Sequence, residues 1–384
     1  MLKCAVGHSN DPDSHTAIAE VLEQISTTLN GVSPNAGILF AAIDFDHPLI
    51  LHHIIAAFPE LQLIGGTTDG EMSSVLGFEQ DSLTLMVFCS DTITISAGMG
   101  RGASKDTLAA AQTAVQQARA AHPTAIQFCI TLPESLTTSG VMILESLQQT
   151  LGVQVPIFGG LTADQSRSQQ TYQFFHTEVC SDAVPILLFS GPVLFSHGIA
   201  NGWEPIGNAG RVTKAENHIV YEIDGQPALA FYHRYLGALP PSFEYPLAVF
   251  DGDSDRYYMR APSGIYDPIV GSINFFGDVA VQSVVQITAT THEDILAASQ
   301  TSIQQAAESY PGHAPAAALF FSCAGRRQLL GHRTREEYEL AQKYLTQTLP
   351  SCGFYTYGEI APLQQHGLTH FHNETFITLL LGAA

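Results

Sequence analysis

Apolar residues along this chain alternate between two patterns. In one they return every three or four positions, as on the buried face of a helix; in the other they form short continuous runs, typical of strands covered on both faces. The helical pattern predicts helices over Ser14–Leu29, Pro48–Phe58, Ser104–Ala121, Thr138–Leu151, His292–Tyr310 and Thr334–Leu349. The continuous runs predict strands over Ala36–Ile43, Leu61–Gly65, Ala125–Thr131, Val153–Gly159, Ala314–Ser322 and Cys352–Tyr355. We expect Ser14 and Ser104 to cap their helices.

These elements repeat in one order, and each repeat ends in a related octapeptide. The three octapeptides are Ile64–Glu71, Phe158–Gln165 and Cys352–Glu359. Further strand-like segments follow the octapeptides: Ser82–Phe88 with Thr92–Ala97, Pro185–Phe189 with Val193–Ser196, and Thr375–Leu381. We therefore predict three copies of a helix–strand–helix–strand–motif–strand unit.

The stretch Arg211–Thr290 does not match this unit cleanly, and we interpret it as a degenerate copy. The Gly-rich segment Asn201–Gly210 precedes it and is our predicted boundary. The chain is then divided into two domains: 1–205 with two repeat units, and 206–384 with the degenerate unit and the third unit. The predicted fold class is mixed α/β: a layered sandwich of mixed sheets flanked by helices, with internal βαβ-type repeats.

Composition narrows the class of partner. The 384 residues include 15 Lys or Arg and 36 Asp or Glu, a formal net charge of −21. Nucleic acid and anionic membrane surfaces are therefore excluded as main partners. Only 13% of residues are charged and 45% are hydrophobic, which excludes a disordered chain. A small molecule or another protein is the expected partner.

The same sequence predicts a soluble cytoplasmic protein. The first ten residues lack the apolar core of a signal peptide, and no apolar run reaches the roughly 18 residues of a membrane span. The six cysteines form no CxxC pair, so we expect reduced thiols.

The glycine-rich octapeptides are candidate binding loops, because glycine lets a ligand approach the backbone and ligands gather at the carboxyl ends of strands in α/β sheets. The alternative is a purely structural turn in which Glu71 and Glu359 accept hydrogen bonds from nearby backbone N–H groups. The candidate pocket residues are Thr67, Thr68, Glu71, Tyr355, Tyr357 and Glu359.

Two adjacent arginines stand out in so arginine-poor a chain. Arg326 and Arg327 follow a buried strand, and either is suited to bind a carboxylate bidentately. The alternative is an internal salt bridge with Glu359. The nearby Cys323 is a candidate nucleophile, although no Cys–His spacing supports that role and a small buried residue is the simpler interpretation.

Several segments resemble the FIST family (F-box and intracellular signal transduction proteins). The FIST-N-like segments are Gly65–Glu71, Gly159–Asp164 and Gly202–Gly207. The FIST-C-like segments are Tyr221–Ala228 with Tyr235–Gly237, Phe321–Arg327, Gly353–Pro362 and His372–Thr375. The resemblance implies a cytoplasmic sensory module for a small ligand. With no output domain recognisable, we expect it to signal in trans to a partner protein such as a histidine kinase.

Some stand-alone bacterial proteins of this kind are haem proteins that sense nitric oxide, so the resemblance implies haem as a cofactor. Haem needs one axial histidine and an apolar slot. Among the sixteen histidines, His197 and His372 are the candidates for that ligand. Each has the alternative of an ordinary hydrogen-bonded histidine.

Four functions remain open at this point. The first is a non-catalytic sensor, most concretely a haem-based sensor of nitric oxide. The second is a sensor of an amino acid or small carboxylate held by Arg326 or Arg327. The third is a hydrolase that uses Cys323 or the carboxylates Glu71 and Glu359. The fourth is an interaction scaffold, for which we would expect a homo-oligomer.

Overall fold

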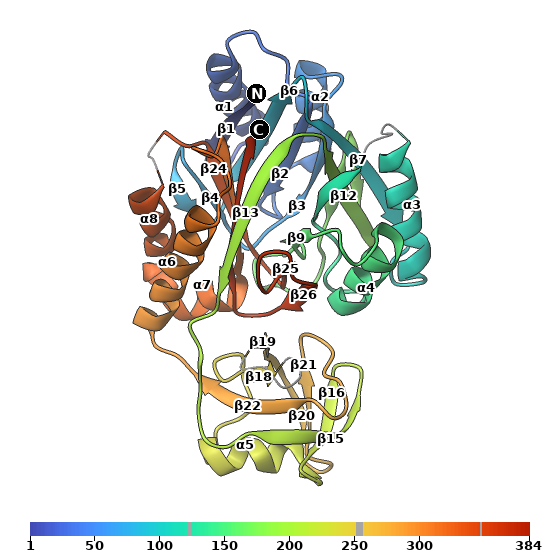
Figure 1. The fold of residues 1–384 in the computed structure, drawn as a ribbon, viewed down its shortest axis with the longest axis vertical. Helices are drawn as coiled ribbons and strands as arrows, with labels where there is room; N and C mark the ends of the chain where they lie inside the picture. The colour runs from blue at the N-terminus through green and yellow to red at the C-terminus, as the bar shows by residue number, and fades with distance from the viewer. Residues whose placement is uncertain (121–124, 251–255, 346–347) are drawn as a thin grey trace.

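The computed structural model shows a large body and a smaller unit joined to it by two connecting segments (Figure 1). It describes residues 1–120, 125–250, 256–345 and 348–384. Ala121 and residues 346–347, parts of two of the expected helices, lie outside the described residues.

The body contains the three predicted repeats. The first comprises β1 (Leu2–Ser9), α1 (Ser14–Leu29), β2 (Ala36–Ala41), α2 (His47–Ala57), β3 (Gln62–Thr67), β4 (Glu71–Ser73), β5 (Gly77–Glu79) and β6 (Leu83–Ser90). The second comprises β7 (Thr94–Arg101), α3 (Thr107–Arg119), β8 (Ile126–Thr131), α4 (Gly140–Leu151), β9 (Ile157–Gly160), β10 (Gln173–Phe175), β11 (Glu178–Cys180) and β12 (Ala183–Ser190). The third comprises β13 (Val193–Ala200), α6 (His292–Glu308), β23 (Ala317–Cys323), α7 (Ala324–Leu330), a short 3-10 turn (Gly331–Arg333), α8 (Arg335–Tyr344), β24 (Ser351–Thr356), β25 (Glu359–Pro362), β26 (Thr369–His372) and β27 (Phe376–Ala383).

Two local expectations need correction. The helix caps are aspartates: Asp13 accepts the N–H of Thr16, and Asp106 accepts the N–H of Ala109. Ser14 is instead the first residue of its helix, while Ser104 lies outside α3 and bonds to Asp182. The second strand of each predicted strand pair also opens the following repeat, so β7 and β13 begin units two and three.

The three sheets exchange hairpins in a ring. Their strand orders are β1-β6-β2-β3-β10-β11, β26-β25-β9-β8-β12-β7 and β13-β27-β23-β24-β4-β5. The hairpin β4–β5 of unit one thus completes the sheet of unit three. The hairpin β10–β11 of unit two completes the sheet of unit one, and the hairpin β25–β26 of unit three completes the sheet of unit two. Within each sheet the second and third strands of the unit are parallel, and their neighbours are antiparallel. The expected mixed α/β class, with mixed sheets flanked by helices, is confirmed.

The inner faces of the three sheets meet in one central core, while the helices cover the outer faces. Aromatic side chains join the sheets in pairs. The ring centroids of Phe40 and Phe354 lie 4.7 Å apart, and those of Phe128 and Phe195 lie 4.8 Å apart. Such contacts add to the stability that burial alone provides. Because the core buries the inner faces of the sheets and the helices bury the outer faces, the strands are continuous apolar runs in the sequence.

The smaller unit lies between β13 and α6 in the chain. It comprises β14 (Glu204–Pro205), β15 (Gly210–Glu216), β16 (Ile219–Ile223), β17 (Gln226–Pro227), α5 (Ala228–Leu236), β18 (Leu247–Phe250), β19 (Tyr257–Arg260), β20 (Pro262–Asp267), β21 (Ser272–Phe275) and β22 (Val284–Ala289). All strand pairs among its described residues are antiparallel, so it differs from the repeats, which each contain a parallel pair. The chain enters this unit at β14, which pairs with β22, and after leaving the unit it returns to the body, where β27 pairs with β13.

Candidate functional site

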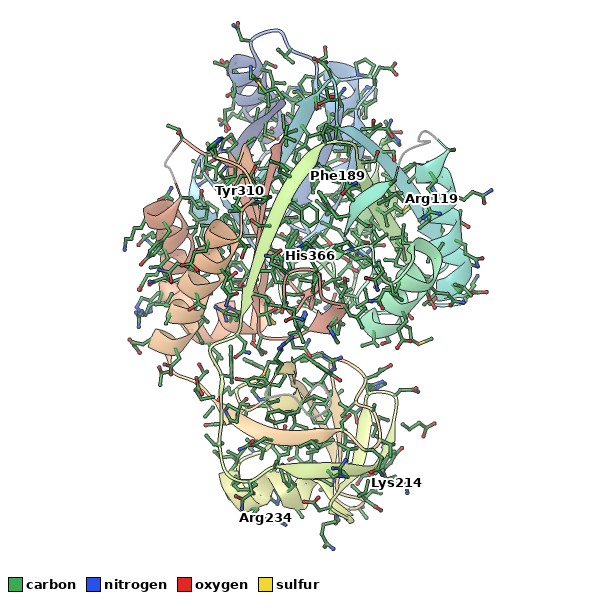
Figure 2. All side chains as sticks on the ribbon, viewed as in Figure 1. Arg119, Phe189, Lys214, Arg234, Tyr310 and His366 are labelled. Atoms are coloured by element: carbon green, nitrogen blue, oxygen red, sulfur yellow. The ribbon has the colours of Figure 1, made fainter. Side chains whose placement is uncertain are left out.

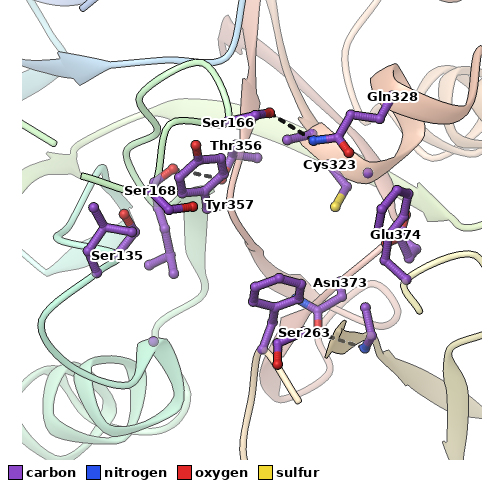
Figure 3. A pocket seen from close by; sticks show the side chains of 18 of the residues that line it. Ser135, Ser166, Ser168, Ser263, Cys323, Gln328, Thr356, Tyr357, Asn373 and Glu374 are labelled. Carbon is purple, nitrogen blue, oxygen red and sulfur yellow. Dashed lines mark hydrogen bonds between the residues drawn. The ribbon is translucent and has the colours of Figure 1, made fainter. Parts of the chain in front are cut away.

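A cavity of about 300 Å³ lies where the body faces the smaller unit (Figure 3). Its body walls come from loops that follow the parallel strands β8, β9, β23 and β24, together with the turn between β26 and β27. The smaller unit contributes Phe243, Ala261, Ser263 and Phe276. Ligands commonly bind at such strand ends and between domains. The sequence prediction named residues of the first and third repeats only, so it included the ends of β23 and β24 but not those of β8 and β9 or the smaller unit.

Glu374 is the central polar group of this cavity. Its side chain is buried, and its Oε2 has no hydrogen-bond partner among the described residues. The residue has a φ of 60°, in the left-handed region that a non-glycine residue adopts at a cost of about 1–3 kcal/mol. Its carboxyl group packs against Gly325, where a Cβ would lie 2.5 Å from Oε1. Any larger residue at position 325 would therefore displace the carboxyl group of Glu374.

Burial also controls the charge of Glu374. It raises the pKa of this carboxyl from 4.5 to about 8, although the charge of Arg326 and a hydrogen bond from Cys323 oppose the shift. At neutral pH the group is therefore mainly a neutral carboxylic acid, able both to donate and to accept a hydrogen bond.

The remaining polar lining consists mainly of hydroxyl and amide groups. Ser135 also has an unpartnered buried Oγ. Tyr357 donates its hydroxyl proton to Asp164 at 2.5 Å. Gln328 donates to Ser166 at 2.8 Å, as Figure 3 shows. None of the described lining residues is a lysine, arginine or histidine. The cavity therefore offers two unsatisfied polar atoms and no positive charge.

Three hydrogen bonds connect the body beside the cavity to the smaller unit, and in one of them the lining residue Ser139 donates its Oγ–H to Asp278 at 3.4 Å. The Oδ1 of Asn373 accepts the backbone N–H of Ala261 at 3.2 Å. Arg260, which is buried, donates to the carbonyl of Phe371 at 2.8 Å. The contacts of Asn373 and Arg260 join the β26–β27 turn, which carries Glu374, and strand β26 to the residue after β19 and to β19 itself.

Of the residues predicted from sequence, Cys323 and Tyr357 line this cavity. Cys323 ends β23 and is buried. Burial, with the charges of Glu359 and Glu374, raises the pKa of its thiol well above 9.0. The thiolate that a nucleophile requires is thus strongly disfavoured here.

Arg326 has a structural role instead of facing a ligand. Its fully buried guanidinium lies 2.7 Å from Oε1 of Glu337 and also donates to the carbonyl oxygens of Ile295 and Asn201. The predicted pocket residue Tyr355 is equally buried and donates its hydroxyl to Glu337 at 2.5 Å. The alternative of an internal salt bridge is correct for Arg326, but its partner is Glu337 and not Glu359.

Arg327 is also paired. Its Nη2 lies 2.8 Å from Oδ2 of Asp69, a buried residue of the first octapeptide, and 14% of the arginine side chain is exposed. Neither arginine therefore presents a free guanidinium to the cavity.

The other octapeptide residues are buried behind the cavity wall. Thr67 accepts the N–H of Tyr172 at 3.0 Å, and Thr68 donates to Glu71. Burial raises the pKa of Glu71 to about 8. Glu359 accepts two hydrogen bonds from Thr375, and burial raises the pKa of Glu359 well above its usual range. Glu359 thus accepts a backbone N–H, as in the structural-turn alternative, whereas Glu71 accepts hydrogen bonds from the hydroxyl groups of Thr68 and Ser82.

The two haem-ligand candidates share one hydrogen-bonding pattern. His197 donates Nε2–H to the carbonyl of Pro362, and His372 donates Nε2–H to the carbonyl of Ala361, both at 2.9 Å. Burial lowers the pKa of His197 to about 4 and that of His372 to about 3, so both rings are neutral. In both, Nδ1 is buried without a partner among the described residues.

This pattern does not fit an axial haem ligand. The nitrogen left for iron is Nδ1, which is bonded to the ring carbon that carries Cβ, so a flat macrocycle bound there would be crowded by the histidine's own Cβ. The cavity beside His197 measures about 250 Å³, below the roughly 300–1,000 Å³ of pockets for drug-sized ligands. Within the described part of the chain, no group of three metal-ligating side chains occurs.

Sequence reasoning missed Glu374, Asn373 and Ser135 as cavity residues. Glu374 and Asn373 lie in the segment His372–Thr375, of which only the histidine was considered. The sequence feature that could have indicated them is the polar pair Asn373-Glu374 between two short apolar runs. Nothing near Ser135 in the sequence distinguished it from other loop serines.

The described residues contain no helix long and apolar enough to cross a membrane. In comparisons with known proteins, an uncharacterized protein of Methanocaldococcus jannaschii is 30% identical over 208 residues, covering 50% of this chain and 39% of that protein. An uncharacterized protein of Mycobacterium tuberculosis is 25% identical over 395 residues, covering 96% of this chain and 97% of its own length. Among solved structures, a cyanuric acid hydrolase from A. caulinodans aligns over 100% of this chain and 99% of its own with 9% identity and a TM-score of 0.37.

Two family models match in succession and together extend over most of the chain. The FIST N domain matches residues 35–226, and the FIST C domain matches residues 228–362. FIST domains form a sensory family of signal transduction that responds to small ligands. This chain, with both domains in their expected order, belongs to the FIST family.

Proposed function

We propose that this protein is a sensor whose small ligand binds in the Glu374 cavity, between the body and the smaller unit. The observation that carries the proposal is the pair of unpartnered buried atoms, Glu374 Oε2 and Ser135 Oγ, on the wall of one cavity. A buried polar atom without a partner costs about 1–3 kcal/mol, and a ligand that pairs with it recovers that free energy.

The lining favours a ligand that carries hydrogen-bond donors over a carboxylate. Arg326 and Arg327 are already paired with Glu337 and Asp69, and the described lining holds no other cation. A primary amine placed beside Glu374 would lower the pKa of this carboxyl and form a charge-assisted pair. We therefore favour an amine or an uncharged polar molecule over the small carboxylate that the arginine pair suggested from sequence.

The signal would pass through the connection between the two parts. Asn373 and Glu374 are neighbours, and the first bonds to the smaller unit. Arg326 donates both to the carbonyl of Glu374 and to the carbonyl of Asn201, in the segment that leads into that unit. A ligand that draws Glu374 toward it would change how the smaller unit is held. A partner protein in trans, of the histidine-kinase type, would bind differently to the two positions of the smaller unit.

A thermal-shift comparison tests the ligand class. Putrescine, ethanolamine, glycine and succinate are added at equal concentration to the wild type and to Glu374→Gln. Stabilisation follows RT ln(1 + [L]/Kd), so an amine at 100 times its Kd adds about 2.7 kcal/mol. We expect an amine to raise the melting temperature of the wild type more than succinate does, and Glu374→Gln to remove that difference. Equal shifts in both proteins would refute the site.

Hydrogen exchange tests the signalling route. The amide of Ala261 is protected by Asn373, so Asn373→Ala should speed its exchange. A stabilising amine should slow exchange at Ala261 in the wild type and have a smaller effect in the variant. If a stabilising amine left the exchange rate of the Ala261 amide unchanged, the ligand would bind without moving the smaller unit, and the proposed signalling route would be wrong.

A further inference from the structure

A second cavity, of about 250 Å³, lies in the body beside β13. It shares no lining residue with the Glu374 cavity. Its walls include Phe158, Leu194 and Phe195, and its mouth is formed by Gln365 and the exposed His366, which Figure 2 labels in the body. The cavity is thus largely apolar and accessible.

Its volume indicates the size of a ligand. An apolar cavity of about 150 Å³ is enough to hold benzene. The second cavity is larger, which suits a molecule of one or two fused rings. Aromatic rings pack against one another in the wall of this cavity: the ring centroids of Phe158 and Phe195 lie 6.0 Å apart, and those of Phe158 and His197 lie 5.2 Å apart.

One polar atom in this wall needs a partner. His197 is 3% exposed, and its Nε2–H is used by the carbonyl of Pro362. Its Nδ1 is therefore an acceptor, and it is the one buried polar side-chain atom without a partner among the described residues that line this cavity. Gln365, which also lines the cavity, donates to the backbone carbonyl of His197. The bond from Nε2–H to the carbonyl of Pro362 sets the ring orientation before any ligand binds.

We infer that this cavity is a binding site for a small planar aromatic molecule with a single hydrogen-bond donor, of the indole or phenol type, which donates to Nδ1 of His197. The apolar walls supply the affinity, and the single acceptor selects for one N–H or O–H at the ring edge. An aromatic carboxylate is excluded because it would place a charge among apolar walls without a paired cation.

The wild-type protein can be tested with two probes of equal shape. Indole carries the required N–H, and benzofuran has oxygen in its place. We expect calorimetry to give one-to-one indole binding and at least about tenfold weaker benzofuran binding, equivalent to about 1.4 kcal/mol. In protein labelled with ¹⁵N-histidine, indole should shift the Nδ1 resonance of His197. No indole binding at millimolar concentration, or equal binding of the two probes, would overturn the inference.

Variants supply independent checks. Ser309→Trp places a large ring at an exposed wall position and should weaken indole binding at least tenfold without touching the core. His197→Phe should do the same. His8→Phe is the matched control, because His8 is also a buried histidine with an unpartnered ring nitrogen but does not line this cavity. Glu374→Gln should leave indole binding unchanged. Full indole affinity in Ser309→Trp and His197→Phe would refute the site.

Discussion

Arg326 and Glu337 form an ion pair in which both side chains are fully buried and Nη2 lies 2.7 Å from Oε1. The pair joins α7 to α8, two helices of the third repeat. Its partners extend further: the same guanidinium reaches Asn201, where the chain leaves the body, and Glu374 at the cavity. Arg326, which the sequence suggested as a ligand-binding residue, therefore stabilises the segments around the cavity without facing its ligand.

Breaking this pair should destabilise the protein strongly. Arg326→Met leaves a buried carboxylate without its partner, a change that typically costs about 3–5 kcal/mol. We expect urea unfolding to show a loss of that size. Arg101→Ala, which removes an exposed pair with Glu178, is the control and should cost about 0–1 kcal/mol. A loss below 1 kcal/mol in Arg326→Met would contradict this role.

Stability should fall as pH rises past neutrality, in part because of Glu374. Its folded pKa, about 8, lies above its ordinary value of 4.5, so the native state holds the proton more tightly. The stabilisation is complete below about pH 4.5 and is lost as pH rises toward 8. Glu374→Gln should reduce the slope of unfolding free energy against pH between 6.5 and 8 by up to about 1 kcal/mol per pH unit.

This pH window also avoids an opposing effect. His8, His197 and His372 have lowered folded pKa values, so they weaken the fold as pH falls below 6.5. Replacing the exposed Glu60 by Gln serves as the control and should keep the wild-type slope. An unchanged slope in Glu374→Gln would contradict the raised pKa.

Cys323 should resist alkylation in the native protein. Its thiol is buried, and burial raises its pKa well above 9.0. With iodoacetamide at pH 8, mass spectrometry should find Cys323 modified more slowly than the partly exposed Cys180, and rapidly only in urea. Fast native labelling of Cys323 would restore the hydrolase hypothesis.

Haem reconstitution should not depend on the two candidate histidines. Because Nε2 of His197 and of His372 is donated to a carbonyl, we expect any Soret band of the wild type to persist in the variant with both replaced by alanine. Absorbance spectra with and without nitric oxide measure this. A band that appears only in the wild type would show that one of these rings reorients to bind haem.

The repeating pattern of apolar residues was sufficient to determine the three units and the mixed α/β class, because burial on one or both faces leaves a local signature in sequence. It did not determine that hairpins of one unit complete the sheet of another, or that β13 pairs with β27 at sequence separations of 176 to 190 residues. Pairing at such a separation depends on the shared core, which no local pattern encodes.

The sequence also singled out the chemistry of the third repeat, but only the tertiary structure decided what each residue does there. Arg326 and Arg327 were visible as rare cations; whether they were free depended on Glu337 and Asp69, from a later helix and from the first repeat. Glu374 looked unremarkable because its raised pKa comes from burial rather than from neighbours in the chain. Residue types limit which chemistry is available, whereas charge state and accessibility depend on packing between distant segments.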